Sequence, residues 1–164
     1  MFSNAEVDAL LALDKRGETG TILIRLGDSK TRTILHCDTH EEYTFLVQVE
    51  LNQKINFKVS LHHQENNTSI GLFRVDYKGS HQNPKDATKA PVMCKPYAGK
   101  FFDTNEPHAH VYSDAYRPMV WAVPLKDVGF STSTIKSSSD TENAIREFFI
   151  KINVITPLTV EQML

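Results

Sequence analysis

The chain has 164 residues, of which 40% are hydrophobic and 23% charged, and its formal net charge is −2. This balance is typical of a folded globular domain, and it excludes a chain that is mainly disordered. It also excludes a strongly basic nucleic-acid coat, so nucleic-acid binding would need a local basic patch. A chain of this length can bury one core, and we expect a single domain over residues 1–164.

Cysteine content and targeting signals indicate the compartment. Cys37 and Cys94 are the only cysteines and are far apart, which excludes zinc ribbons and disulfide scaffolds. We expect two reduced thiols, with one disulfide between them as the alternative. The start of the chain lacks the basic and apolar regions of a secretory signal, and no apolar run approaches the length of a membrane span. The sequence therefore predicts a cytoplasmic protein with no membrane partner.

The first predicted element is a helix after Ser3. Ser3 and Glu6 have the spacing of a capping box, and Val7, Leu10 and Leu11 follow on one face. The helix should therefore begin near Asn4 and pack through its apolar face.

A series of predicted strands follows the helix. Apolar and polar residues alternate with period two, with short polar connections, over residues 22–26, 31–37, 43–51, 55–61 and 70–77. Period two with one apolar face is typical of a half-buried antiparallel meander. Two shorter strands are expected over residues 108–112 and 119–125.

The C-terminal part predicts a second helix, with a capping box at Ser139 and an apolar stripe that includes Phe148. Residues 159–164 are expected to form one closing turn. The predicted fold class is α+β: a curved antiparallel meander of about six or seven strands, packed by an N-terminal and a C-terminal helix. The sheet could curl towards a partial barrel.

The alternation breaks over residues 78–107. This segment holds four of the seven prolines and five lysines. A connection this long inside a compact domain is typically a lid or a binding loop, or it hides a short hairpin.

Polar side chains of two predicted strands could form one site. Residues two apart share a face of a strand, so Arg74 lies beside Asp76, and His108, His110 and Tyr112 lie together. If the two strands are neighbours, these five residues form one patch. Four residues of the 78–107 segment are predicted to border it and bind substrate: His81, Asn83, Lys78 and Lys85.

Three kinds of chemistry fit this patch. In the first, His108 and His110 act as acid and base on a phosphodiester, and Arg74 binds the phosphate. In the second, His108 and His110, with Asp76 or His81, bind a transition metal. In the third, the patch is a binding surface without turnover.

The motifs resemble a known family. They are Leu72-x-Arg74-x-Asp76, Gly79-x-His81-x-Asn83-Pro84, His108-x-His110-x-Tyr112 and Trp121-Ala122-x-Pro124-Leu125. This string resembles a family of short prokaryotic and prophage proteins classed as a domain of unknown function. The stretch from Arg74 to Tyr112 also resembles, more faintly, small RNA-acting toxins of toxin–antitoxin pairs. The resemblance implies the fold and the polar cluster, and a setting in toxin–antitoxin systems or phage defence.

The sequence thus predicts a small prokaryotic or phage protein with a phosphate-directed site, acting as a metal-independent RNase-like enzyme without a cofactor. In this hypothesis Asp76 orients Arg74 or a histidine, and Tyr112 assists. Two alternatives stay open. One is a non-catalytic protein that binds a host or antitoxin protein through residues 78–107. The other is a metal-dependent hydrolase that uses His108, His110 and His81.

Overall fold

The computed structural model describes residues 1–52 and 57–162. Helices, strands and two 3₁₀ helices (η) alternate along this part of the chain. In order, they are α1 (Asn4–Ala12), β1 (Arg16–Gly17), β2 (Ile22–Arg25), β3 (Lys30–His36), β4 (Thr44–Asn52), β5 (Lys58–Glu65), β6 (Ile70–Tyr77), β7 (His81–Gln82), η1 (Val92–Tyr97), β8 (Phe101–Phe102), β9 (His108–Val111), β10 (Trp121–Pro124), η2 (Leu125–Val128), α2 (Ser138–Lys151) and β11 (Leu158–Glu161).

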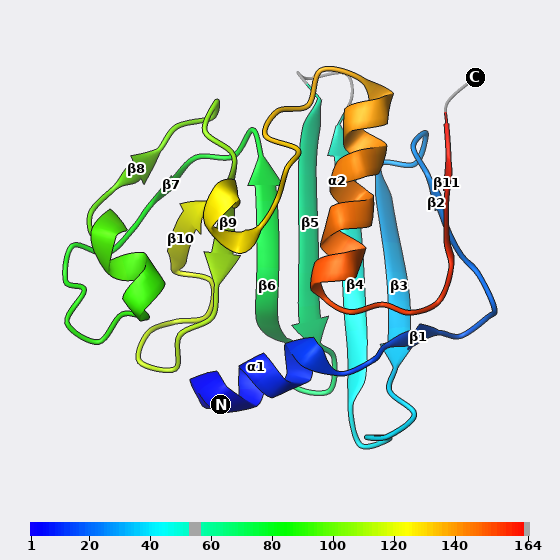
Figure 1. The fold of residues 1–164 in the computed structure, drawn as a ribbon, viewed down its shortest axis with the longest axis horizontal. Coiled ribbons are helices and arrows are strands. Elements are labelled where there is room, and N and C mark those ends of the chain that lie inside the picture. The colour runs from blue at the N-terminus through cyan, green and yellow to red at the C-terminus, as the bar shows by residue number, and fades with distance from the viewer. Residues whose placement is uncertain (53–56, 163–164) are drawn as a thin grey trace.

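An antiparallel sheet of seven described strands forms the centre of the fold (Figure 1). Its order is β1-β3-β4-β5-β6-β9-β10, so consecutive strands from β3 to β6 are neighbours, as expected for a meander. β1 and β10 form the two edges of the described sheet, which stays open and does not close into a barrel. The predicted α+β fold class is confirmed.

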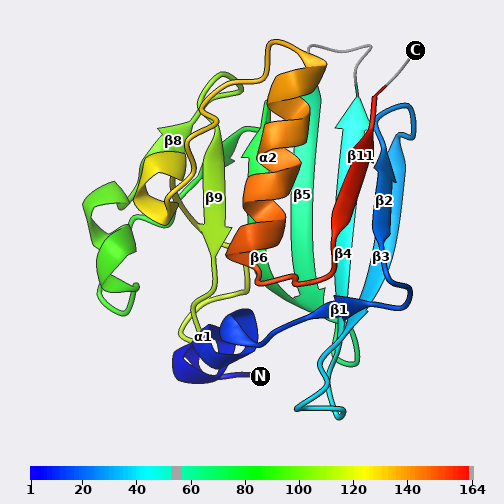
Figure 2. The ribbon, with the colours of Figure 1, turned by 45° about the vertical axis from the view of Figure 1, so that its right-hand side comes forward.

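α2 covers one face of this sheet, over β4 and β5 (Figures 1 and 2). The predicted apolar stripe makes the contact: Ile145 and Phe148 are fully buried, and the Phe148 ring stacks on Phe73 of β6 at 5.6 Å. α1 lies at one end of the sheet and buries Val7 and Leu10. None of the described helices lies over the opposite face of the sheet in either view.

The helix starts follow side-chain capping. In α1, the Ser3 and Glu6 capping box is present as predicted. In α2, the N-cap is Ser137, whose side chain accepts from the main-chain N–H of Asp140. The predicted box at Ser139 was wrong by two residues, because serines at 137, 138 and 139 offer equivalent capping groups.

Two elements have partners that the sequence did not indicate. The strand predicted at 22–26 is β2, but it lies outside the meander and pairs in parallel with β11. β11 replaces the closing turn expected at 159–164, whose last two residues lie outside the described part. Period two identifies a strand but not its partner, and this partner is far away in the sequence. The predicted strand at 55–61 begins outside the described residues and continues to Glu65.

The 78–107 segment contains a short hairpin, which was one of the alternatives expected from the sequence. β7 pairs with β8, η1 lies between them, and the segment lies at the β9–β10 side of the sheet (Figure 1). None of the described helices combines the length and apolar character needed to cross a bilayer.

Candidate functional site

Four predicted site residues meet on neighbouring strands. β6 pairs antiparallel with β9, so Arg74 lies opposite His110 and Asp76 lies opposite His108. The hypothesis of a shared site required these strands to be neighbours, and the structure shows that they are. The intervening residues, such as Phe73 and Val75, are buried on the α2 side. The four polar side chains therefore lie on the face that α2 leaves open.

Asp76 is the centre of this group. Its Oδ1 accepts hydrogen bonds from Ser60 Oγ at 2.7 Å and Arg74 Nε at 3.0 Å, and its Oδ2 lies 3.1 Å from His110 Nε2. Burial by itself raises the pKa of this carboxyl group, but the hydrogen bonds and charges of His110 and Arg74 outweigh it. The pKa of Asp76 is therefore held well below its usual value.

His110 is held at both ring nitrogens. Its Nδ1 lies 2.8 Å from the carbonyl oxygen of Met119, and its Nε2 faces Asp76 Oδ2. The Met119 carbonyl oxygen only accepts, so Nδ1 carries a hydrogen. The Asp76 carboxylate lies between the His110 ring and the Arg74 guanidinium.

His108 is fully buried and differs in its hydrogen bonds. Its Nδ1–H donates to the carbonyl oxygen of Glu106 at 2.9 Å. Burial lowers the pKa of His108, with His110 adding to the effect, so the ring is neutral and Nε2 holds a lone pair. That Nε2 has no hydrogen-bond partner among the described residues and lies 4.0 Å from Asp76 Oδ2. We refer to Asp76, His108 and His110 as the Asp–His–His cluster.

Residues of the 78–107 segment cover the cluster. The His81 ring meets the His110 ring edge to face at 4.6 Å, and the Phe102 ring lies 4.9 Å from the His108 ring. His81 Nε2–H donates to the carbonyl oxygen of Val120 at 2.8 Å, and burial lowers the pKa of His81. His81 therefore lies beside the cluster with its Nε2 directed to the backbone.

One strained backbone segment orients two of the imidazoles. Met119 has a φ of 65°, in the left-handed region that is uncommon for a residue other than glycine. The carbonyl oxygens of Met119 and the next residue, Val120, accept from His110 and His81. Strained conformations of this kind cluster at functional sites, where the surrounding structure holds them in place.

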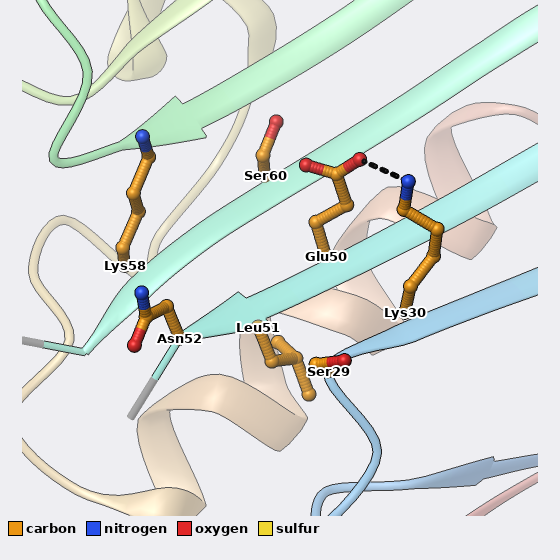
Figure 3. A pocket seen from close by; sticks show the side chains of 7 residues that line it. All are labelled: Ser29, Lys30, Glu50, Leu51, Asn52, Lys58 and Ser60. Carbon is orange, nitrogen blue, oxygen red and sulfur yellow. Dashed lines mark ion pairs between the residues drawn. The ribbon is translucent and has the colours of Figure 1, made fainter. Parts of the chain in front are cut away.

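Two polar grooves on the open sheet face include residues that hydrogen-bond to Asp76. One groove, of about 290 Å³, is lined by Arg32, Gln48, Glu50, Ser60, His62, Gln64 and Arg74. A second, of about 310 Å³, is lined by Ser29, Lys30, Glu50, Leu51, Asn52, Lys58 and Ser60 (Figure 3). The grooves share Glu50 and Ser60, and Ser60 donates to Asp76. The acidic lining residue, Glu50, pairs with Lys30 at 3.4 Å.

Three predicted site residues lie elsewhere. Tyr112 follows the last residue of β9, so the strand alternation no longer fixes its direction, and its hydroxyl donates to the Phe2 carbonyl oxygen at 2.6 Å. Lys78 donates to Asn105 Oδ1 at 3.0 Å. Lys85 lies beside Gly99 in the covering segment. The structure shows no contact of these three side chains with the described cluster atoms.

Asn83 makes structural hydrogen bonds, and its predicted contact with substrate stays a prediction. Its side chain is 2% exposed. The amide donates to the carbonyl oxygens of Tyr97 and Ala122, and accepts from the Ala122 N–H at 2.8 Å. These bonds fasten the covering segment to β10.

Replacing Asn83 with alanine is expected to lower the free energy of unfolding by about 2 kcal/mol, because buried backbone groups lose their partners. Urea unfolding measures this change. The exposed Asn105, whose side chain bonds Lys78, is the control, and Asn105→Ala should change stability by less than about 0.5 kcal/mol. Equal losses in both variants would contradict this role of Asn83.

Sequence reasoning missed two parts of the site. Ser60 shares the polar face of its strand with Lys58 and His62, so alternation could have placed it on the open face. The Met119 and Val120 carbonyl groups leave no signal in the sequence, because every residue has such a group.

Comparison with protein families matches residues 2–154 to a family of unknown function, DUF6978. The chain belongs to this family. The DUF6978 match includes the whole Asp–His–His cluster and ends before β11. It supports the expected domain of unknown function, whereas the prophage setting and the likeness to toxins stay predictions. Searches of curated proteins and of solved structures found no match to the chain.

Proposed function

We propose that this protein is a hydrolase that binds a phosphodiester substrate, specifically RNA, along the open sheet face and cleaves it at the Asp–His–His cluster. The supporting observation is one cross-strand row. Its successive partners are Arg32, Gln48, His62, Arg74 and His110. Because neighbouring strands lie about 4.8 Å apart, the row spans about 19 Å, enough for several nucleotides.

The charges along this row suit a phosphate backbone. The two grooves contain four cationic side chains, from Lys30, Arg32, Lys58 and Arg74, and one acidic side chain, from Glu50. A local basic groove supplies the positive potential that phosphate binding needs, even on a chain with a net charge of −2. Arg74 lines one groove and pairs with Asp76 of the cluster at 2.9 Å, and its side chain is 43% exposed.

The geometry disfavours the hypothesis that His108 and His110 act as a separate acid and base. Both nitrogens of His110 are held in hydrogen bonds, and His108 is fully buried. Neither ring offers an exposed nitrogen for proton transfer to a polymer in this arrangement. The partial exposure of Arg74 beside Asp76 supports the proposed role of Arg74 in positioning the phosphate.

Replacing Arg74 with methionine is expected to lower kcat/KM for a short RNA about 100-fold, a loss typical of removing one donor where negative charge develops. Cleavage of an end-labelled oligoribonucleotide measures it. Arg74→Lys, which keeps the charge, should recover part of the activity.

Arg25 is the matched control, since it is an exposed arginine on β2 that pairs with Glu161 at 3.5 Å. Arg25→Met should cleave at the wild-type rate. Unchanged cleavage in Arg74→Met, or no cleavage of RNA by the wild-type protein, would refute the proposal.

A second candidate function rests on exposed apolar side chains of the covering segment. Val92 is 82% exposed and Phe101 55% exposed, which is unusual for large hydrophobic residues. These residues fit the alternative that a host or antitoxin protein binds the 78–107 segment. In that case the double variant Val92→Ser, Phe101→Ser would abolish the biological effect, and His108→Ala would leave it intact.

A further inference from the structure

We propose that Asp76 Oδ2, His108 Nε2 and His110 Nε2 bind one divalent transition-metal ion. This inference concerns the centre used in the proposed function, but it needs no particular substrate. The sequence left Asp76 and His81 open as the third ligand, and we choose Asp76, because His81 Nε2 donates to the Val120 carbonyl oxygen.

The three ligand atoms are already close together. All lie within 4.8 Å of one another, with Asp76 Oδ2 at 3.1 Å from His110 Nε2 and 4.0 Å from His108 Nε2. A metal with bonds of about 2.1 Å requires ligand atoms about 3.0–3.5 Å apart. Small rotations of the side chains therefore suffice, and any proton on His110 Nε2 is released to solvent when the ion binds.

The second layer of contacts is that of a metal site. Histidine ligands in metalloproteins typically donate their other N–H to a carbonyl or carboxylate group, which fixes the ring and its tautomer. Here His108 Nδ1 donates to Glu106 and His110 Nδ1 donates to Met119, so both Nε2 atoms turn to Asp76. Ser60 donates to the other carboxylate oxygen, Oδ1, and thereby orients Oδ2.

His108 provides an independent observation. The side chain is fully buried, and its Nε2 lone pair has no hydrogen-bond partner among the described residues. A buried acceptor without a partner destabilises the folded protein. A purely structural ion pair between Asp76, Arg74 and His110 would not need this nitrogen, whereas a metal ion would use it.

The ligand set indicates the class of ion. Two imidazoles and one carboxylate suit Zn²⁺, Fe²⁺ and their neighbours, whereas Mg²⁺ and Ca²⁺ prefer oxygen ligands. Three protein ligands leave positions for water, as in catalytic metal sites. An ion here would supply the activated water that hydrolysis needs, and Arg74 would bind the phosphate beside it.

Isothermal titration of Zn²⁺ into chelator-treated wild-type protein tests the proposal. We expect one ion per chain. His108→Ala and Asp76→Asn should each weaken binding more than about 100-fold, because even loss of a second-layer contact typically costs 10–100-fold. His40→Ala is the control for surface histidines, since His40 is exposed and contacts Thr39. This variant should bind Zn²⁺ like the wild type.

Two measurements on the wild type remain informative if the variants do not fold. Bound Co²⁺ should give visible d–d absorption that Zn²⁺ abolishes. An excess of Zn²⁺ about 100-fold over Kd should raise Tm by about 5–10 °C. No saturable binding by the wild type, or equal binding by folded His108→Ala, overturns the proposal.

These outcomes are separate from those of the proposed function. Stoichiometric Zn²⁺ binding with no RNA cleavage would support the metal site and refute the hydrolase. RNA cleavage by a metal-free protein that a chelator does not reduce would support the hydrolase. It would overturn the proposal that the hydrolase uses a metal ion at this site.

Discussion

Replacing Asp76 with alanine is expected to lower the free energy of unfolding by about 3–5 kcal/mol, the usual cost of removing one partner from a buried charge network. Asp76 is 6% exposed, and its carboxylate pairs with Arg74 at 2.9 Å and His110 at 3.1 Å. Without it, the Arg74 guanidinium, the Ser60 hydroxyl and the His110 ring lose their shared hydrogen-bond partner. Urea unfolding at pH 7 measures the loss.

The effect should depend on pH in a defined direction. The pKa of Asp76 is lowered in the folded protein, so its contribution is fully present above the unfolded-state pKa of about 4. That contribution disappears as the pH falls from about 4 towards the folded pKa. The difference between wild type and Asp76→Ala should therefore shrink in acid.

Asp38 is the control carboxylate. It is 69% exposed and pairs with Arg16 at 2.7 Å, so Asp38→Ala should cost less than about 1 kcal/mol. Equal destabilisation by both replacements would show that Asp76 is not the centre of a buried network.

Replacing Lys15 with methionine is expected to cost about 2–4 kcal/mol at pH 7. The Lys15 side chain is fully buried, and its Nζ donates to the carbonyl oxygens of Leu11, Leu13 and Ile152. These bonds tie the end of α1 to the end of α2. Methionine fills much of the volume but leaves the carbonyl groups without a donor. Thermal and urea unfolding measure the change.

The pKa of Lys15 gives this prediction a second test. Burial lowers it to about 8, from 10.5, so between pH 8 and 10.5 the unfolded chain binds more protons than the folded one. Stability contributed by this group therefore rises with pH across that window. The deficit of Lys15→Met relative to wild type should widen between pH 8 and 10.5.

Lys126, which is exposed on η2, is the control, and Lys126→Met should change stability by less than about 0.5 kcal/mol at either pH. A deficit of Lys15→Met that stays constant with pH would contradict the lowered pKa.

Local sequence patterns predicted most of the central sheet. Alternation identified β3, β4, β5 and β6, and short polar connections predicted that consecutive strands of this set are antiparallel neighbours. The parallel pair of β2 and β11 was not predictable in this way, because it depends on the chain returning after α2. Lys15 is a similar case, since nothing nearby in the sequence marks it as buried.

The sequence predicted which site residues share a face of one strand, but it did not predict which strands pair. Period two correctly placed Arg74 with Asp76, and His108 with His110. It misplaced Tyr112, because β9 ends at Val111 and alternation ends with the strand. The pairing of β6 with β9 across residues 78–107 is a tertiary contact, which one strand's pattern does not specify.

NMR of the histidine rings tests most directly whether Asp76, His108 and His110 form one functional centre. Long-range ¹H–¹⁵N spectra of the wild-type protein would be recorded alone, with Zn²⁺, and with a short RNA. Alone, His108 should carry its hydrogen on Nδ1 and a lone pair on Nε2. Zn²⁺ should shift the Nε2 signals of His108 and His110 together, RNA should shift the His110 signals, and the exposed His36 and His40 should not respond. A protonated His108 Nε2, or no response of the cluster to either addition, would contradict the account.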